Sequence, residues 1–314
     1  MKLKLELNKK TVTAAIIVFA VIAALFIFYI RPPVLIVTEK SFIEIYGKER
    51  IQNEAFSSAL AMFRPVKIVT VANDAGEDTV PFAVSSAAIK PFCVIFPLRF
   101  VKSAVLYREL APNIPIVVLE GRYLEEENPS GSVLGEEKSE YFVFKTDISD
   151  DFYRIGLAVT TIKLKNDQKY ENSTLDEGKK GRVALFLDYK INKMKDVFLR
   201  GLYDNGELFE TLFYNGYSQY MELPDLSCAV MAGTGTDFME KKTDVPIISF
   251  TWIDPSLLPF NVAMIVNDSP LAQARQAVKM VKSGVKNGLI KSEFRVLDRT
   301  KFDRKLIAII KKNR

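Results

Sequence analysis

The chain of 314 residues contains no histidine and only two cysteines. Serine and cysteine nucleophiles that need a histidine base are therefore excluded, and so is zinc held by histidine. Carboxylate or lysine chemistry is all that remains for an enzyme. The Ser-x-x-Lys spacing of Ser283 and Lys286 lacks the Lys-Thr-Gly motif that accompanies it in acyl-serine enzymes. We therefore expect a protein that holds a ligand without transforming it, with no cofactor and no metal site.

Polar and aromatic side chains follow short apolar runs along the chain. In open α/β sheets, ligands bind outside the carboxyl ends of the strands, so residues directly after each run are candidates. The ligand-binding candidates in the first half are Ser41, Phe42, Asn73, Arg99, Glu120 and Arg122, and those in the second half are Tyr189, Thr234, Trp252 and Asp254.

These candidates suggest specific chemistry, each with an alternative. Arg99 and Arg122 can hold an anion through charge-assisted hydrogen bonds, or form a surface ion pair with Glu120. Trp252, the single tryptophan, can stack on a planar ligand or serve only in packing. Free N–H groups in the AGTGTD turn at 232–237 can bind a carboxylate or phosphate, or belong to an ordinary strand-to-helix turn.

Alternating β-branched runs and amphipathic stretches must position these residues, and this pattern predicts an α/β fold with doubly wound parallel sheets. The first series has expected strands at 34–38, 66–72, 92–96 and 115–120, and expected helices at 41–62, 78–89 and 99–110. The acidic segment 121–140 has no core of its own, and it lacks the Asp/Asn alternation of a calcium loop.

A second series follows that segment. Its expected strands are 141–146, 182–188, 208–214, 227–233, 245–251, 261–267 and 293–298. We expect helices opened by Ser149, over 192–204, and from 269 onward with Ser269 as cap and Pro270 in the first position. Cys93 and Cys228 fall in expected buried strands, which predicts unpaired thiols.

Residues 11–30 form an uncharged apolar run, and twenty helical residues span the ~30 Å hydrocarbon core of a bilayer. Four lysines precede the run and only Arg31 follows it, so the positive-inside rule predicts a cytoplasmic N-terminus and a periplasmic or extracytoplasmic body at the inner membrane. A cleavable signal peptide is the alternative. The first 32 residues carry most of the net charge of +5, so nucleic acid is not an expected partner.

The order of elements resembles a type I periplasmic binding protein, the fold shared by ABC-transporter substrate-binding proteins and lac-repressor-like effector domains. The resemblance covers 34–300 and is carried by the strand and helix at 34–62, VVLEGR at 117–122, FLRGLYDNG at 198–206, IISFT at 247–251, and NDSPLAQARQAVKMVKSG at 267–284. It implies a first lobe of 33–121 plus about 254–290, a second lobe of about 140–253 plus 291–300, and a tail at 301–314. The chain would then cross between lobes near 121–140, 251–260 and 288–293.

Two departures from this resemblance bear on the ligand. Sugar-binding members end the strand matching 245–251 in an aspartate, where this chain has Thr251, and they place an arginine where this chain has Phe198. Both differences argue against a sugar. Glu120 and Arg122 stand where such proteins often carry an Asp-Arg pair.

The sequence thus predicts a membrane-anchored solute-binding protein that clamps a small polar or aromatic non-sugar ligand between two lobes, as the substrate-binding component of an ABC transporter. Its membrane partner would be an ABC permease or a sensor. The alternative is a degenerate binding-protein fold that acts as a sensor or protein-interaction module in the cell envelope.

Overall fold

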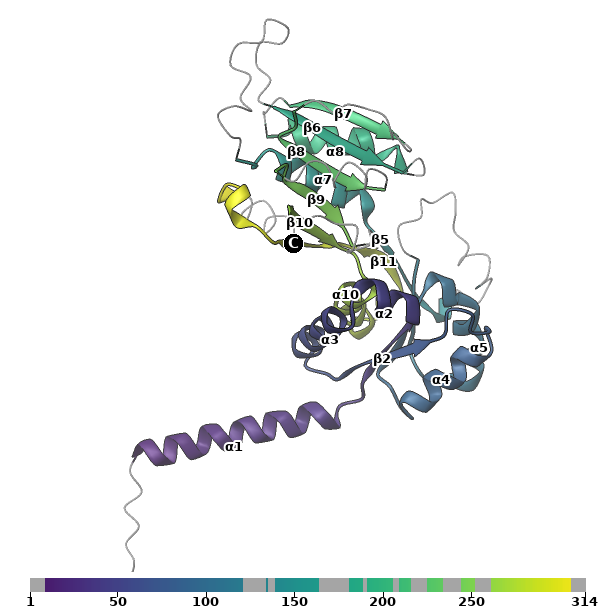
Figure 1. Cartoon of the computed structure of the whole chain (residues 1–314). Coiled ribbons are helices and arrows are strands. Elements are labelled where there is room, and N and C mark those ends of the chain that lie inside the picture. The colour runs from purple at the N-terminus through teal and green to yellow at the C-terminus, as the bar shows by residue number, and fades with distance from the viewer. Residues whose placement is uncertain are drawn as a thin grey trace, which may run out of the picture.

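The computed structural model describes residues 9–120, 134, 139–163, 181–188, 191–205, 209–215, 225–233, 244–251 and 261–305. Two six-stranded sheets, each covered by helices, form two lobes, and the apolar helix α1 (Lys9–Ile30) projects from the first lobe as a separate rod (Figure 1). The α/β fold class expected from the alternating pattern is confirmed.

The first sheet has the strand order β11-β5-β4-β3-β1-β2, and its pairs are parallel. Its strands are β1 (Val34–Glu39), β2 (Val66–Val71), β3 (Cys93–Pro97), β4 (Ile116–Leu119), β5 (Phe142–Thr146) and β11 (Asn287–Ile290). Successive side chains of a strand point to opposite faces of a sheet. Val34 and Ile36 therefore pack beneath α2 (Lys40–Tyr46), α3 (Lys48–Met62) and α10 (Pro270–Lys282), while Leu35 and Val37 pack beneath α4 (Thr79–Ala87) and α5 (Val101–Leu110).

The second sheet has the order β12-β10-β9-β8-β6-β7, with β12 antiparallel to β10. Its strands are β6 (Arg182–Leu187), β7 (Glu210–Asn215), β8 (Cys228–Ala232), β9 (Ile247–Phe250), β10 (Val262–Asn267) and β12 (Glu293–Val296). One face is buried under α7 (Ile148–Val159) and α8 (Met194–Tyr203). Phe198 lies in that core with no exposed surface, so it is a packing residue.

The sheet order corrects two of the three expected crossings between lobes. The segments 121–140 and 251–260 each connect neighbouring strands of one sheet, β4 to β5 and β9 to β10. The chain instead crosses from β5 to α7, from β10 to α10, and from β11 to β12, the last of which agrees with the crossing expected near 288–293. Strand β5 therefore belongs to the first lobe and β10 to the second. The expectation failed because a polar connection in the sequence does not specify which sheet the next strand joins.

Several local expectations also change. The helix expected over 41–62 is two helices, broken at Gly47, whose φ of 91° favours glycine. Asp147, and not Ser149, caps α7, its side chain accepting from the backbone N–H of Asp150. The expected Ser269 cap and the first-position Pro270 of α10 are confirmed. Both cysteines are buried and unpaired, as expected.

Candidate functional site

The strand ends of the first sheet bring together four polar residues, which we call the first-lobe cluster: Glu39, Ser41, Asn73 and Arg99. The backbone N–H of Ser41 donates to Asn73 Oδ1 at 2.8 Å, and Ser41 Oγ donates to Glu39 Oε2 at 3.3 Å. Arg99 pairs with Glu39, and its other amino group donates to the Asn73 carbonyl at 2.5 Å. Three candidates from the sequence are thus within one hydrogen-bonded group.

The order of strands in the sheet explains why the residues of the first-lobe cluster lie together. Strands β2, β1 and β3 are neighbours and parallel, so the residues that follow them lie along one edge. Glu39 was missing from the sequence-based candidates because it is the last residue of β1 itself. The signal that would have found it is its position as the first charged residue after the uncharged run VLIVT.

The ion pair changes what the cluster can bind. Arg99 is 59% exposed in its side chain, whereas Glu39 is 17% exposed and neutralises it. The edge therefore offers amide and guanidinium donors beside carboxylate and carbonyl acceptors, with no net charge from this pair. Such an edge suits a polar ligand that both donates and accepts hydrogen bonds better than a simple anion.

The other two described candidates have structural contacts. Phe42 stacks on Tyr46 with ring centroids 5.1 Å apart, and it packs against the first-lobe core. Glu120 is buried with 5% side-chain exposure, and its Oε2 lies 3.3 Å from Lys145 Nζ on the neighbouring strand β5. Glu120 therefore carries a buried charge that is paired within the sheet.

Five candidates lie outside the described residues: Arg122, Tyr189, Thr234, Trp252 and Asp254. The described part of the second-lobe edge contains Gly233. Its φ is 145°, and a Cβ added there would lie only 2.5 Å from the Asp188 backbone nitrogen, so both the backbone angle and the close contact require glycine. Thr251 directly follows β9, and its hydroxyl donates to Asp268 Oδ1 at 2.5 Å. An acidic side chain does reach this edge, but Asp268 supplies it from the crossing after β10.

Polar contacts hold the three crossings, which we together call the hinge. Gln273 Nε2 donates both to Thr146 Oγ1 and to the Asp268 carbonyl, each at 2.7 Å, and so links the first two crossings. At the third crossing, Arg154 donates to the Ser292 carbonyl at 3.1 Å, and Ser292 Oγ donates to Asp151 Oδ2 at 2.5 Å.

Asp151 is the carboxyl group of this hinge whose pKa is shifted. Burial is the largest cause that raises its pKa, and the nearby Asp268 carboxylate also raises it. The Ser292 hydrogen bond and Arg154 oppose the increase, and the net result is a pKa of about 8. Its second oxygen, Oδ1, is buried and has no hydrogen-bond partner in the described part of the chain. Asp151 is therefore largely protonated at neutral pH.

A second junction joins the lobes at one side. Glu54 on α3 accepts from Tyr46 Oη at 3.0 Å, from Asn267 Nδ2 at 3.2 Å and from Ser269 Oγ at 3.3 Å. Burial, followed by the charge of Glu54, raises the pKa of Tyr46 above its ordinary value. Asn267 ends β10 in the second sheet, so Glu54 connects the two lobes directly.

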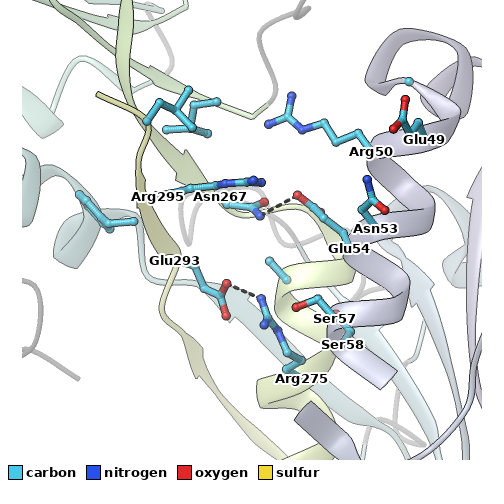
Figure 2. Close-up of a pocket in the computed structure, with 15 residues that line it drawn as sticks. Glu49, Arg50, Asn53, Glu54, Ser57, Ser58, Asn267, Arg275, Glu293 and Arg295 are labelled. Atoms are coloured by element: carbon cyan, nitrogen blue, oxygen red, sulfur yellow. Dashed lines mark hydrogen bonds and ion pairs between the residues drawn. The ribbon is translucent and has the colours of Figure 1, made fainter. Parts of the chain in front are cut away.

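Glu54 and Asn267 of this junction line a groove of about 750 Å³ between α3 and the strands β10 and β12. Figure 2 shows Arg50 and Arg295 extending into it from opposite walls, with the Arg275–Glu293 ion pair below. The lining has three arginines and three glutamates, Glu49, Glu54 and Glu293, so it has no net formal charge. None of these charged residues was a candidate from the sequence, because they lie on helices α3 and α10 and on the antiparallel strand β12, and none follows the carboxyl end of a parallel strand.

The described residues contain no group of three acidic or cysteine side chains that could hold a metal ion. Searches of protein-family models and of curated proteins found no match for the chain. Solved structures do match it. A transcriptional activator of the comK gene from Bacillus halodurans covers 90% of this chain and 95% of its own, with a TM-score of 0.53 and 11% identity. An ABC-transporter solute-binding protein from Conexibacter woesei DSM 14684 covers 90% and 94%, with a TM-score of 0.57 and 9% identity.

The chain has the type I periplasmic-binding-protein fold. Two lobes, three crossings and near-complete coverage of both structures support this assignment, and the low identities mean that the likeness extends to the fold alone. Within this periplasmic-binding-protein fold, the first-lobe cluster lies on the edge that the resemblance implied for ligand contact. Phe198 in the core and Thr251 on Asp268 remain the two departures from the sugar-binding pattern.

Proposed function

We propose that the chain is a membrane-anchored binding protein that closes its two lobes over a small polar, non-sugar solute. The observation that carries the proposal is the first-lobe cluster, a polar group assembled from three separate strand ends at the edge where open α/β sheets bind ligands. The Conexibacter solute-binding protein shares the fold and supports a role as the binding component of an ABC transporter.

The charge of the cluster defines the ligand class. Because Glu39 neutralises Arg99, the edge favours a neutral or zwitterionic molecule with several hydrogen-bonding groups. Thr251, which is engaged with Asp268, takes the place of the aspartate implied by the sugar-binding resemblance. Closure over the ligand would be a hinge motion at the three crossings, where Gln273, Asp151 and Arg154 tie the segments together.

The anchor is α1, in which Val12–Ile30 is apolar and long enough to cross a bilayer. Its lysine-rich start supports, by the positive-inside rule, a cytoplasmic N-terminus with both lobes outside. Alkaline carbonate extraction tests the anchor, since an integral protein stays in the membrane pellet. Protease added outside spheroplasts should degrade the lobes and leave a short fragment containing α1; full protection of the lobes would contradict this topology.

A thermal-shift screen of the full chain in nanodiscs tests ligand binding. A solute at 100 times its Kd stabilises the folded state by about 2.7 kcal/mol, which corresponds to roughly 5–10 °C in Tm. The library should contain amino acids, small carboxylates, nucleosides and sugars. We expect a hit among the polar non-sugar compounds, and the absence of any hit would contradict the proposal.

One observation favours a second function, a sensor or protein-interaction module of the envelope. Within the first-lobe cluster, Asn73 already accepts hydrogen bonds from the Arg99 guanidinium and from the Ser41 backbone N–H, so these polar groups have partners without a solute. If the chain is such a module, a stable protein partner should co-purify with the tagged full chain from its native membrane. A solute hit with no such partner would exclude it.

A further inference from the structure

The first lobe has a second edge, at the amino ends of its parallel strands. Parallel pairing places the residues that precede β1, β2, β3, β4 and β11 along this one edge. Backbone hydrogen bonds connect these segments, from Val34 N–H to the Pro65 carbonyl at 2.9 Å and from Phe92 N–H to the Pro33 carbonyl at 2.8 Å. We call this edge, formed by 31–33, 63–65, 88–92, 110–115 and 282–286, the base surface.

Large apolar side chains are exposed at four separate segments of the base surface. Ile89 is 94% exposed, Leu110 53%, Val285 41% and Phe63 40%. These residues come from the ends of α3, α4 and α5 and from the turn after α10. Single exposed apolar residues are ordinary, but their recurrence at successive segments of one edge indicates an apolar interaction surface.

The charge of the base surface is mainly positive. Its cations are Arg31, Arg64, Lys90, Lys282 and Lys286, and Glu109 and Glu140 lie beside it as exposed acids. At the opposite edge of the same sheet, Glu39, Glu77 and Glu120 are paired with Arg99, Lys102 and Lys145, and Asp74 and Asp78 add further negative charge. The base surface therefore complements an anionic surface, and the ligand edge does not.

The helix α1 enters at this same edge. Only residues 31–33 separate Ile30 from β1, and three extended residues reach about 10 Å. The junction is also held by contacts: Arg31 donates to the Phe63 carbonyl at 3.2 Å, Arg64 donates to the Pro32 carbonyl at 2.8 Å, and the rings of Phe28 and Phe63 lie 5.8 Å apart. A bilayer that contains α1 is thus within reach of the base surface.

We infer that the base surface rests on the membrane, with Phe63, Ile89 and Leu110 at the interface and the basic residues on anionic phospholipid headgroups. This inference rests on the membrane anchor of the proposed function. Aromatic residues and basic side chains are the groups that favour such an interface. The strand-end edge of the first lobe then faces away from the bilayer, and Figure 1 shows the second lobe on that far side.

Spin-label accessibility in the full chain tests the inference. Single-cysteine variants Ile89→Cys, Tyr203→Cys and Val21→Cys are reconstituted in nanodiscs of phosphatidylcholine with phosphatidylglycerol. Ile89 reports the base surface, Tyr203 is an exposed control on the second lobe, and Val21 reports insertion of α1. The native cysteines are both buried, so the introduced thiol takes the label.

We expect the label at 89 to collide more with oxygen than with a water-soluble nickel complex, and the label at 203 to show the reverse. Adding Lys90→Glu and Lys282→Glu should reduce the lipid-exposed signal at 89, as should nanodiscs of phosphatidylcholine alone. A water-exposed label at 89 together with a lipid-exposed label at 21 would overturn the inference and leave the anchor standing. A label at 89 shielded from both reagents would indicate contact with a second copy and would also overturn it. A water-exposed label at 21 would overturn the anchor and the inference together.

Discussion

Glu39, the last residue of β1, forms an ion pair with Arg99, which lies two residues after the neighbouring strand β3, at the edge where a ligand would bind. Arg99 also donates to the Asn73 carbonyl, so a single guanidinium joins three strand ends. From the sequence, Arg99 is a candidate for binding an anion. In the structure its charge is neutralised by Glu39, so the two side chains together form a polar group with no net charge.

Replacing Arg99 should affect binding far more than stability. Arg99 is 59% exposed, and a solvated ion pair contributes about 0–1 kcal/mol, so Arg99→Ala should lower the free energy of unfolding by about 1 kcal/mol or less. Urea unfolding measures this loss. Arg182→Ala is the matched control, because it removes a half-exposed Arg–Glu pair at the start of β6 in the second lobe. The control should keep the response to any solute hit, and equal loss of the response in both variants would argue against the cluster.

Protonation of Asp151 should make stability depend on pH. Its pKa rises from 3.8 to about 8 in the folded chain, so the folded state keeps a proton that the unfolded chain releases. Stability should therefore fall as pH rises between about 4 and 8, by at most about 1.4 kcal/mol per pH unit from this group. Asp151→Asn should remove that part of the slope in urea titrations, whereas Asp196→Asn, exposed on α8, should leave it unchanged. Identical slopes in wild type and Asp151→Asn would contradict this account.

Gly47 should tolerate no side chain without strain, although the space around it is open. Its φ of 91° lies where non-glycine residues are strained, and Gly47→Ala should cost about 1–2 kcal/mol. Gly284→Ala is matched, since its φ is 72° and its surroundings are also open. Both variants should lose similar stability in thermal melts. Only Gly47→Ala, which moves the helix carrying Ser41, should also weaken solute binding.

Glu54 and Asn267 should be energetically coupled across the lobes. Their hydrogen bond has a carboxylate acceptor and joins residues 213 positions apart, so a double-mutant cycle of Glu54→Ala and Asn267→Ala should give about 1.5–3 kcal/mol. Asn53→Ala, an exposed neighbour on α3, paired with Asn267→Ala is the control and should give no coupling. Additive effects in the first cycle would show that the lobes are not held at this point.

Much of the fold follows from local pattern, and the site only in part. Ser41, Asn73 and Arg99 were predictable because each lies within a few residues of the end of an apolar run, and parallel strands place such residues on one edge. Glu39 was missed because it continues the strand. The short strand β11, with the sequence NGLI, offers too few β-forming residues to be recognised without its partner β5.

The lobe assignments could not be predicted for a different reason. Strands β5 and β10 read as ordinary members of their neighbouring series, and only pairing with β4 and β9 decides which sheet each strand joins. The hinge contacts of Asp151 with Ser292, and of Glu54 with Asn267, join residues far apart in sequence and depend on those crossings. Local periodicity in the sequence therefore predicts neither the sheet that these strands join nor the contacts across the crossings.

Closure of the lobes is the central claim, and pulsed electron resonance measures it most directly. Spin labels at Phe82→Cys on α4 and Tyr203→Cys on α8 report the separation of the lobes in the full chain, because both positions are exposed. With a polar solute from the thermal-shift screen, we predict a changed and narrower distance distribution in the wild-type background and in Arg182→Ala, and no change in Arg99→Ala. A distribution that stays the same with every stabilising solute, or that changes equally in Arg99→Ala, would contradict the account.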